Sequence, residues 1–404
     1  MVRTVQSRSG APLQGIRVLD LTRVLSGPYC TMMLADQGAE VVKVEIPGRG
    51  DDGRHVGPPF KGSESAFFIS VNRNKKSLTL NLKSDCGVEV LKRLASKADV
   101  LVENYRPGVA QRLGIDYERV KDVNPAIVYC SISGFGQTGP YRERAGYNFT
   151  VQALSGVMTV SGMPGTPPHP VGISLGDIPA GMFAAFAIST ALLERMRTGH
   201  GQYIDIGMLD ALVAMMEYPL ARFGMTGVCP PAIGQYNPSI TPFGVLETAD
   251  RSIVLAAGND KLWGLLCEVL ERPDLLENPE YETNPLRTRN RASLYAELTK
   301  TLKTRPANEW LDALVEAGVP AACVSDVSDV FSDPQVRARG MVQRVVQPQA
   351  GEVAVAGCPV RIGESSDRAF RPAPQLGEHT QQVLRSWLDM TDSEIDGLRA
   401  GEVL

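Results

Sequence analysis

The sequence predicts an α/β protein whose larger part is a doubly wound parallel sheet. The strand patterns IRVLDL (16–21) and AEVVKVE (39–45) flank a helical run from Tyr29 to Gln37 that Gly38 closes. Strand, helix and strand within about 30 residues form a right-handed βαβ unit with parallel strands. The same alternation recurs further along the chain, so ligands are expected at the carboxyl ends of the strands.

The next elements extend this sheet. They are, in order, a strand at 77–82, a helix at 84–97, a strand at 99–105, a helix at 109–123, a strand at 127–136, a Gly- and Pro-rich loop at 161–172, a helix from about 178 to 197, and a strand and helix within 201–218. Together they assign the large domain to residues 1–221.

A second domain follows a change in composition. Residues 222–242 are rich in Gly, Pro, Asn and Ser, which is typical of a linker or flap. Residues 243–325 predict a small α+β domain with a hairpin at 243–258, three helices (259–271, 287–304 and 307–317) and a core that includes Trp263, Tyr281 and Trp310. Residues 326–404 are expected to be a linker and a C-terminal segment that returns to the large domain.

Composition excludes several classes of function. A formal charge of −4 argues against a general nucleic-acid binder. The N-terminus is polar, and the longest apolar stretch, Met182 to Leu193, is shorter than the roughly 20 residues that cross a bilayer. Seven cysteines without a CxxC pair indicate free thiols. We therefore expect a cytoplasmic protein that does not associate with membranes.

Common cofactor and nucleophile motifs are missing. The first βα turn, TRVLSGP (22–28), is not GxGxxG, which weakens a nicotinamide-enzyme interpretation. The four histidines have no metal-ligand spacing, and no GxSxG motif occurs. No metal and no tightly bound cofactor are expected.

Asp177 is the leading candidate for chemistry. It stands in GISLGDIPAGMFAAFAIS, directly before a long apolar helix, where an aspartate can simply cap the helix. A carboxylate between small residues is also accessible to a bulky thioester and can act as a nucleophile. We expect the helix dipole and backbone N–H groups to keep it ionised.

Basic residues are expected in the loops at the carboxyl edge of the sheet, where a few could hold phosphates. They are Arg23, Arg49, Arg54, Arg73, Lys75, Lys76, Arg106 and Arg112.

The order of motifs along nearly the whole chain resembles CoA-transferase family III, the group that contains formyl-CoA and carnitine CoA-transferases. The motifs include VLDLTRVLSGP, GAEVVKVE, NRNKKSLTLNLK, ADVLVENYRPG, GFGQTGPY, RAGYN, GDIPAG and LGEHT. The resemblance implies that Asp177 is the acyl acceptor. It implies contacts to CoA, which is a substrate, from Arg23, Val24, Leu25, Ser26, Asn74, Lys75, Asn104, Tyr105 and Arg112. It further implies a homodimer of two interlocked rings, each with a Rossmann-like large domain, a small domain and linkers.

The resemblance also bears on the substrate. Segments such as SVNRNKKS and VENYRPG look closest to succinyl-CoA-dependent transferases that act on glutarate, hydroxymethylglutarate, itaconate, mesaconate or malate. Such a reaction would pass through a mixed anhydride and an aspartyl-CoA thioester on Asp177. An arginine is expected to bind the second carboxylate of the acid, with Arg23 as first candidate and Arg73 or Arg106 next.

Departures from the family pattern leave alternatives open. Tyr147 and Asn148 are further substrate-binding candidates, although the family often has an acid where Asn148 stands. The racemase branch has a catalytic histidine about where Tyr147 stands, and the oxalate-using branch has a glycine-run flap where residues 234–243 read GQYNPSITPF. These differences disfavour racemisation and oxalate. An α-methylacyl-CoA racemase or dehydratase-like enzyme and a non-catalytic CoA-binding homologue remain as alternatives.

Overall fold

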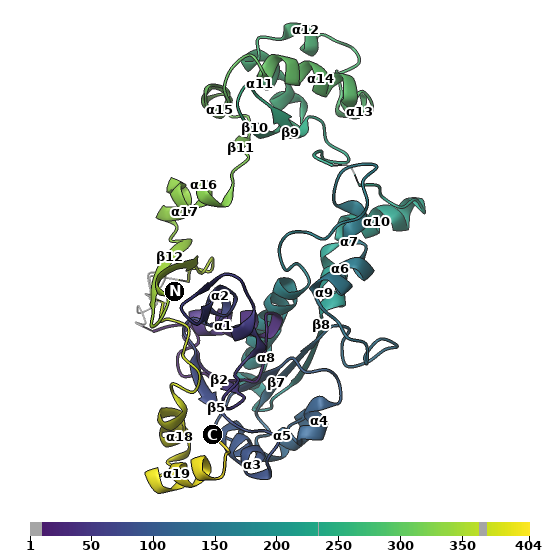
Figure 1. Cartoon of the computed structure of the whole chain (residues 1–404). Coiled ribbons are helices and arrows are strands. Elements are labelled where there is room, and N and C mark those ends of the chain that lie inside the picture. The colour runs from purple at the N-terminus through teal and green to yellow at the C-terminus, as the bar shows by residue number, and fades with distance from the viewer. Residues whose placement is uncertain (1–9, 233, 363–369) are drawn as a thin grey trace, which may run out of the picture. The chain divides into compact units, whose positions relative to one another are not determined.

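The computed structural model describes residues 10–232, 234–362 and 370–404, which form two compact units (Figure 1). The first unit contains the described residues of Met1–Val157, Pro170–Tyr218 and Gln335–Leu404. The second contains those of Met158–His169 and Pro219–Pro334. Each unit has its own hydrophobic core, and we describe them separately.

The elements of the first unit alternate between strands and helices over most of its length. They are β1 (Arg17–Asp20), α1 (Ser26–Asp36), β2 (Glu40–Glu45), the short 3₁₀ helix η1 (Asp52–His55), β3 (Phe60–Lys61), β4 (Glu64–Ser65), α2 (Ala66–Asn72), β5 (Lys76–Thr79), α3 (Asp85–Ala95), β6 (Val100–Glu103), α4 (Val109–Leu113), α5 (Tyr117–Val123), β7 (Val128–Ser133), α6 (Asn148–Ser155), α8 (Asp177–Thr198), β8 (Tyr203–Gly207), α9 (Met208–Met215), β12 (Val342–Gln347), β13 (Gly351–Ala356), α18 (Thr380–Leu388) and α19 (Asp392–Ala400).

The central sheet confirms the predicted α/β fold. Its strand order is β5-β2-β1-β6-β7-β8, and every neighbouring pair is parallel. The chain winds outward in one direction from β1 to β5 and then in the other from β6 to β8. The direction therefore reverses between β1 and β6, and sheets of this kind bind ligands beside such a switch point, at the carboxyl ends of the strands.

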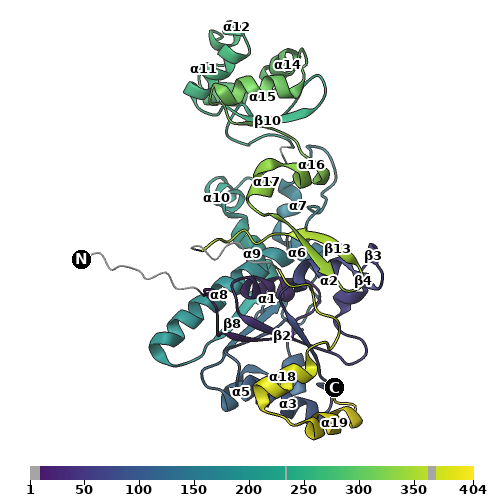
Figure 2. The same ribbon diagram turned by 90° about the vertical axis from the view of Figure 1, so that its left-hand side faces the viewer.

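Helices cover both faces of this sheet. Alternate residues of the strands face opposite ways, so Leu19 of β1 packs into a cluster with α3, α5 and α18, and Val18 packs into one with α1 and α8. Figure 2 shows the C-terminal helices α18 and α19 beside α3. The C-terminal segment thus completes the core on one face of the sheet.

Several predicted boundaries differ from the structure. The first helix begins at Ser26 rather than Tyr29. The single helix predicted over 109–123 is wrong: α4 and α5 are separated at Gly114, whose φ of 71° ends the first of them. The helix predicted over 287–304 is likewise two helices, and the short elements α2, β3 and β4 had no clear sequence signal.

The second unit is a small α+β structure. Its elements are β9 (Phe243–Glu247), β10 (Ser252–Ala256), α11 (Asp260–Val269), α12 (Pro273–Leu276), α13 (Asn284–Arg289), α14 (Arg291–Leu302), α15 (Ala307–Glu316), β11 (Ala321–Cys323) and α16 (Val327–Ser332). Three further helices cross the sequence boundaries between the units: α7 (Val157–Val160), α10 (Glu217–Thr226) and α17 (Pro334–Ala338).

The core of this unit was predicted correctly. The hairpin β9–β10 is antiparallel, and β11 adds a third strand. Trp263, Tyr281 and Trp310 are all buried in the core beneath the sheet and helices.

Helix α8 is the one described helix that is long and apolar enough to cross a membrane. Core helices of soluble proteins meet the same length and composition test, so this is weak evidence for a span. Buried residues of α8, such as Ala184 and Ile188, belong to the cluster that packs against the sheet. The helix begins at Asp177, which places the candidate nucleophile at the edge of the core.

Candidate active site

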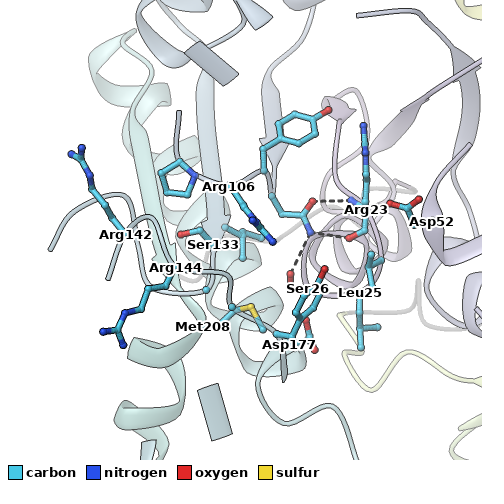
Figure 3. Close-up of a pocket in the computed structure, with 18 residues that line it drawn as sticks. Arg23, Leu25, Ser26, Asp52, Arg106, Ser133, Arg142, Arg144, Asp177 and Met208 are labelled. Atoms are coloured by element: carbon cyan, nitrogen blue, oxygen red, sulfur yellow. Dashed lines mark hydrogen bonds between the residues drawn. The ribbon is translucent and has the colours of Figure 1, made fainter. Parts of the chain in front are cut away.

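A cavity of about 240 Å³ lies at the carboxyl ends of the central strands (Figure 3). The loops after β1, β6 and β7 and the first residues of α8 and α9 form it. Its lining residues are Arg23, Val24, Leu25, Ser26, Asp52, Asn104, Tyr105, Arg106, Pro107, Ile132, Ser133, Gly134, Arg142, Arg144, Gly146, Tyr147, Asp177 and Met208. The structure thus brings Asp177 together with eight other predicted site residues, from Arg23 to Ser26 and at Asn104, Tyr105, Arg106 and Tyr147.

Two glycines let the start of α8 approach its neighbours closely. A Cβ on Gly176 would lie 2.6 Å from Val151 Cγ2, and a Cβ on Gly181 would lie 2.6 Å from the carbonyl oxygen of Ser26. Both contacts are too short for any side chain. The small residues around Asp177 therefore serve to bring the carboxylate against α6 and the first turn of α1.

Asn148 fixes the backbone that precedes Asp177. The Gly176 N–H donates to Asn148 Oδ1 over 2.8 Å, and Gln152 Nε2 donates to the same oxygen over 2.8 Å. Asn148 was predicted to bind substrate, but it lies outside the cavity lining. The structure gives it a positioning role through the Gly176 peptide instead.

Asp177 does not cap its helix. Gly176 is the N-cap residue and Asp177 is the first helical residue. No group in the described parts of the chain donates a hydrogen bond to the Asp177 carboxylate, and burial raises its pKa from 3.8 to about 6. We expected the helix dipole and backbone N–H groups to keep it ionised, but the pKa shifts in the opposite direction because burial dominates. A carboxyl group with this pKa is still largely ionised at pH 7.5, and as an anion it has no hydrogen-bond partner among the described residues.

This raised pKa predicts how stability depends on pH. The folded state favours the protonated carboxyl, so the contribution of Asp177 to stability is present below pH 3.8 and is lost as the pH rises through about 6. We expect Asp177→Asn to have a higher melting temperature than the wild type at pH 8 and a similar one at pH 4. Thermal unfolding at both pH values measures this; an equal gap at both would contradict the raised pKa.

The loop after β1 is held by the loop after β6. The Arg23 N–H donates to Asn104 Oδ1, and Asn104 Nδ2 donates to the Arg23 carbonyl, both over 2.8 Å. The Arg23 guanidinium lies over the ring of Tyr105, with its carbon 5.4 Å from the ring centroid. In Figure 3 the Arg23 side chain points away from Asp177. Asn104 therefore shapes the cavity wall through the backbone of Arg23.

Lys75 lies outside the cavity, which argues against the predicted contact with CoA. Its side chain is fully buried, and its ammonium donates to Asp20 Oδ2 (3.0 Å), the Pro28 carbonyl (2.9 Å) and Asn72 Oδ1 (2.9 Å). A lysine has three N–H donors, so none is left for a phosphate. Burial also lowers the pKa of Lys75 to about 8.

Asn74 and Arg73 are also engaged internally. The Arg73 guanidinium donates to both oxygens of Asp36, over 3.0 and 2.6 Å, and to the Ala356 carbonyl. Asn74 donates to Asp36 and accepts from the Arg371 N–H. These contacts tie α1, α2 and the C-terminal segment together. They leave Arg73 no free edge for the second carboxylate of a substrate.

A second cavity of about 500 Å³ shares Arg106, Pro107 and Arg142 with the first. Arg112 lies here, as do Gln137 and Glu143. Neither Arg106 nor Arg112 forms an ion pair within the described residues, whereas exposed Arg142 pairs with Glu143 over 3.2 Å. Two cationic side chains are thus available beside the cavity that holds Asp177.

Three arginines near Asp177 differ in direction. In Figure 3 the side chain of Arg106 points toward the middle of the cavity, and those of Arg142 and Arg144 point to its outer side. Arg144 stacks on Tyr141, with its guanidinium carbon 3.6 Å from the ring centroid. Sequence reasoning did not single out Arg142, Arg144 or Ser133. Ser133 is the last residue of β7 and the two arginines lie in the loop that follows, so their place at the carboxyl end of a predicted parallel strand was the available signal. Within the described residues, no group of three His, Cys, Asp or Glu side chains is placed to hold a metal ion.

The fold and this cavity define an α/β protein with a half-buried carboxylate, Asp177, in the same cavity as Arg106, which has no ion-pair partner within the described residues. Residues 13–380 match CoA-transferase family III. The chain is 40% identical to human succinyl-CoA:glutarate CoA-transferase over 97% of this chain and 90% of that protein. It is 41% identical to acetyl-CoA:oxalate CoA-transferase of Acetobacter aceti, covering 94% and 96% of the two chains. It is also 41% identical to succinyl-CoA:mesaconate CoA-transferase of Haloarcula marismortui, covering 92% and 95%.

Solved structures agree with this assignment. A CAIB/BAIF family protein from Brucella suis superposes with a TM-score of 0.84 and 36% identity, over 94% of this chain and 100% of that one. A protein from Mycobacterium tuberculosis gives a TM-score of 0.82 and 31% identity, over 92% and 98%. The chain belongs to CoA-transferase family III, and it is an enzyme with CoA-transferase activity.

Proposed function

We propose that this CoA-transferase moves CoA from an acyl-CoA, with succinyl-CoA as the favoured donor, to a dicarboxylic acid, and that Asp177 carries the covalent intermediates. The observation that carries this proposal is the Asp177 carboxylate, which lines the cavity and accepts no hydrogen bond from the residues that the structure describes. A carboxylate in this state is free to attack a thioester.

The reaction needs no proton transfer at any step. An Asp177 oxygen attacks the thioester carbonyl, the C–S bond breaks, and CoA thiolate leaves a mixed anhydride. The thiolate then attacks the aspartyl carbonyl of the anhydride, which releases the donor acid as a carboxylate and leaves an aspartyl-CoA thioester. The acceptor carboxylate attacks this thioester, and the same two steps run in reverse. No histidine is among the described residues that line the cavity, which fits a reaction without general acid–base catalysis.

Arg112 in the second cavity supports a site for the anionic end of CoA. It has no ion-pair partner within the described residues, and guanidinium groups bind phosphates through paired N–H donors. We assign the phosphates to this side, the acyl group to the side of Asp177, and no bound metal or prosthetic group to either.

Trapping of the intermediate tests this function directly. After incubation with succinyl-CoA and then hydroxylamine, we expect mass spectrometry to find a hydroxamate on Asp177 of the wild type and none in Asp177→Ala. CoA binding by calorimetry is the control for the variant. A wild type that binds CoA and gives no hydroxamate would favour a racemase-like or non-catalytic protein.

The acceptor acid is proposed from relatives that are named for different acids. Those described above are named for glutarate, oxalate and mesaconate at similar identity, so identity does not decide among them. The acceptor panel must therefore include oxalate beside the longer dicarboxylates. Rapid transfer to oxalate alone would overturn the preference for longer acids.

A homodimer in the cytoplasm is proposed as the working form. One face of α8 exposes large apolar side chains, with Phe186 71% and Met196 83% exposed. The set is Met182, Phe183, Phe186, Leu193 and Met196. Contiguous apolar surface of this kind indicates burial against another chain. The seven cysteines are free thiols, which suits a reducing compartment.

Light scattering at micromolar concentration tests the dimer. We expect the mass of two chains for the wild type and a shift toward one chain for Phe186→Lys, because the added charge would be buried. Ser96→Lys, on exposed surface away from α8, is the matched control and should stay dimeric. A monomeric wild type would refute the proposal.

A further inference from the structure

Val24 lines the cavity in a conformation that valine rarely adopts. Its φ is 65°, in the left-handed region. A β-branched residue is strained there and persists only when its surroundings hold it. The wall of the cavity therefore contains a strained peptide. The groups that hydrogen-bond to this peptide are candidates for keeping it in the strained conformation.

Buried groups hold the polar atoms of the backbone around this residue. The Val24 N–H donates to Asp51 Oδ1 over 2.9 Å, and Lys43 Nζ donates to the Thr22 carbonyl over 2.7 Å. Between them, the Arg23 peptide is held on both sides by Asn104. The Thr22 N–H donates to Asp20 Oδ1 over 2.9 Å. The turn is thus fixed at consecutive residues.

Two of these groups form a buried ion pair. Lys43 Nζ lies 2.7 Å from Asp51 Oδ2, and the two side chains are 0% and 1% exposed. Asp51 is anchored in turn, because its N–H donates to Glu45 Oε2 over 2.9 Å and Glu45 accepts from Arg54. The pKa of Lys43 is raised by its acidic neighbours and that of Asp51 is lowered by Lys43, so both remain charged at neutral pH.

We infer that Lys43 and Asp51 are positioning residues that hold the Thr22–Val24 turn in its strained form and so keep the acyl-CoA site open beside Asp177. Neither residue touches the cavity, so each acts through the backbone. The inference rests on the proposed use of this cavity for acyl-CoA. Without the pair, the turn would relax, and binding would have to restore the strained form. The apparent Kd for acyl-CoA would equal the intrinsic Kd divided by the fraction of molecules whose turn is in the strained form. Saturating acyl-CoA would restore that form in every molecule, so kcat would be recovered.

Asp51→Asn tests this inference through a split between KM and kcat. The amide keeps an acceptor for the Val24 N–H but removes the charge that faces Lys43. We expect KM for acyl-CoA, and Kd for CoA by calorimetry, to rise about tenfold or more while kcat changes less than about threefold. Adding Val24→Gly to Asp51→Asn should recover part of the loss, because glycine adopts positive φ without strain.

Asp36→Asn is the matched control. It breaks the buried Arg73–Asp36 pair, whose side chains are 4% and 2% exposed and lie outside the cavity. It should lower the melting temperature and leave KM for acyl-CoA unchanged. An equal rise in KM in Asp51→Asn and Asp36→Asn would mean that the effect comes from general instability, which would overturn the inference. An unchanged KM in Asp51→Asn would also overturn it.

Hydrogen exchange on the wild type gives a second test, which holds even if the variants fail to fold. The amides of residues 22–24 should be protected in the free protein, before CoA is added. Protection that appears only with CoA would show that the ligand builds the turn, which contradicts the inference. A wild type that binds no CoA would instead refute the proposed function of the cavity.

Discussion

Asp177→Asn should lower kcat for CoA transfer by at least about 10⁴-fold, because removing a covalent nucleophile costs an amount of this order. The asparagine amide has nearly the same shape and lacks a nucleophilic oxygen. CoA affinity should stay within about threefold, since Arg112, the proposed phosphate ligand, is unchanged. The measurement is initial rate with succinyl-CoA and glutarate, together with calorimetry of CoA.

Asp205→Asn is the matched control for this loss. Burial also raises the pKa of Asp205, but this residue lies in β8 and does not line the cavity with Asp177. Its transfer rate should remain close to that of the wild type. A similar loss of transfer rate in both variants would mean that these carboxylates affect the rate through protein stability rather than through covalent chemistry.

The sequence was sufficient for the fold and for the position of Asp177 at the edge of the sheet, because both depend on local patterns, whereas its role as nucleophile stays a prediction from the family resemblance. Buried strand patterns and the spacing between them predicted a parallel sheet, and the motif around Asp177 stands at the carboxyl edge of that sheet as expected. The direction of the Asp177 pKa shift was not predictable in the same way. It depends on how closely α8 packs against α6 and α1, which is determined by residues far away in the sequence, such as Val151 and Ser26.

The charged residues show the limit of sequence reasoning more clearly. Lys75 and Arg73 stand in the densest basic segment, yet their partners are Asp20 and Asp36, far away in sequence. A basic segment in the sequence indicates positive charge, but only the fold shows whether that charge already forms an ion pair inside the protein. The same holds for Val24, whose strained backbone has no signature in the residue type.

Arg106 is the arginine that we now expect to bind the second carboxylate of the acid. Arg23 was the first candidate, but its side chain lies over Tyr105 and points away from Asp177, and Arg73 is paired inside the protein. Arg106 lines the cavity without an ion-pair partner in the described residues, and its side chain points toward the middle of the cavity (Figure 3). A charged hydrogen bond lost from a buried carboxylate costs about 1.5–3 kcal/mol.

Arg106→Met should therefore lower kcat/KM for glutarate by about 10- to 10²-fold, given that each 1.4 kcal/mol is about tenfold. Part of any loss could come from weaker CoA binding, so the decisive quantity is the ratio between glutarate and a monocarboxylate of similar length, such as valerate. Weaker CoA binding lowers both rates equally, whereas loss of the carboxylate contact lowers only the rate with glutarate. Arg23→Met, measured beside it, should leave this ratio unchanged. A ratio that collapses in Arg23→Met and not in Arg106→Met would return the assignment to Arg23 and would mean that its side chain turns toward Asp177 when substrate binds.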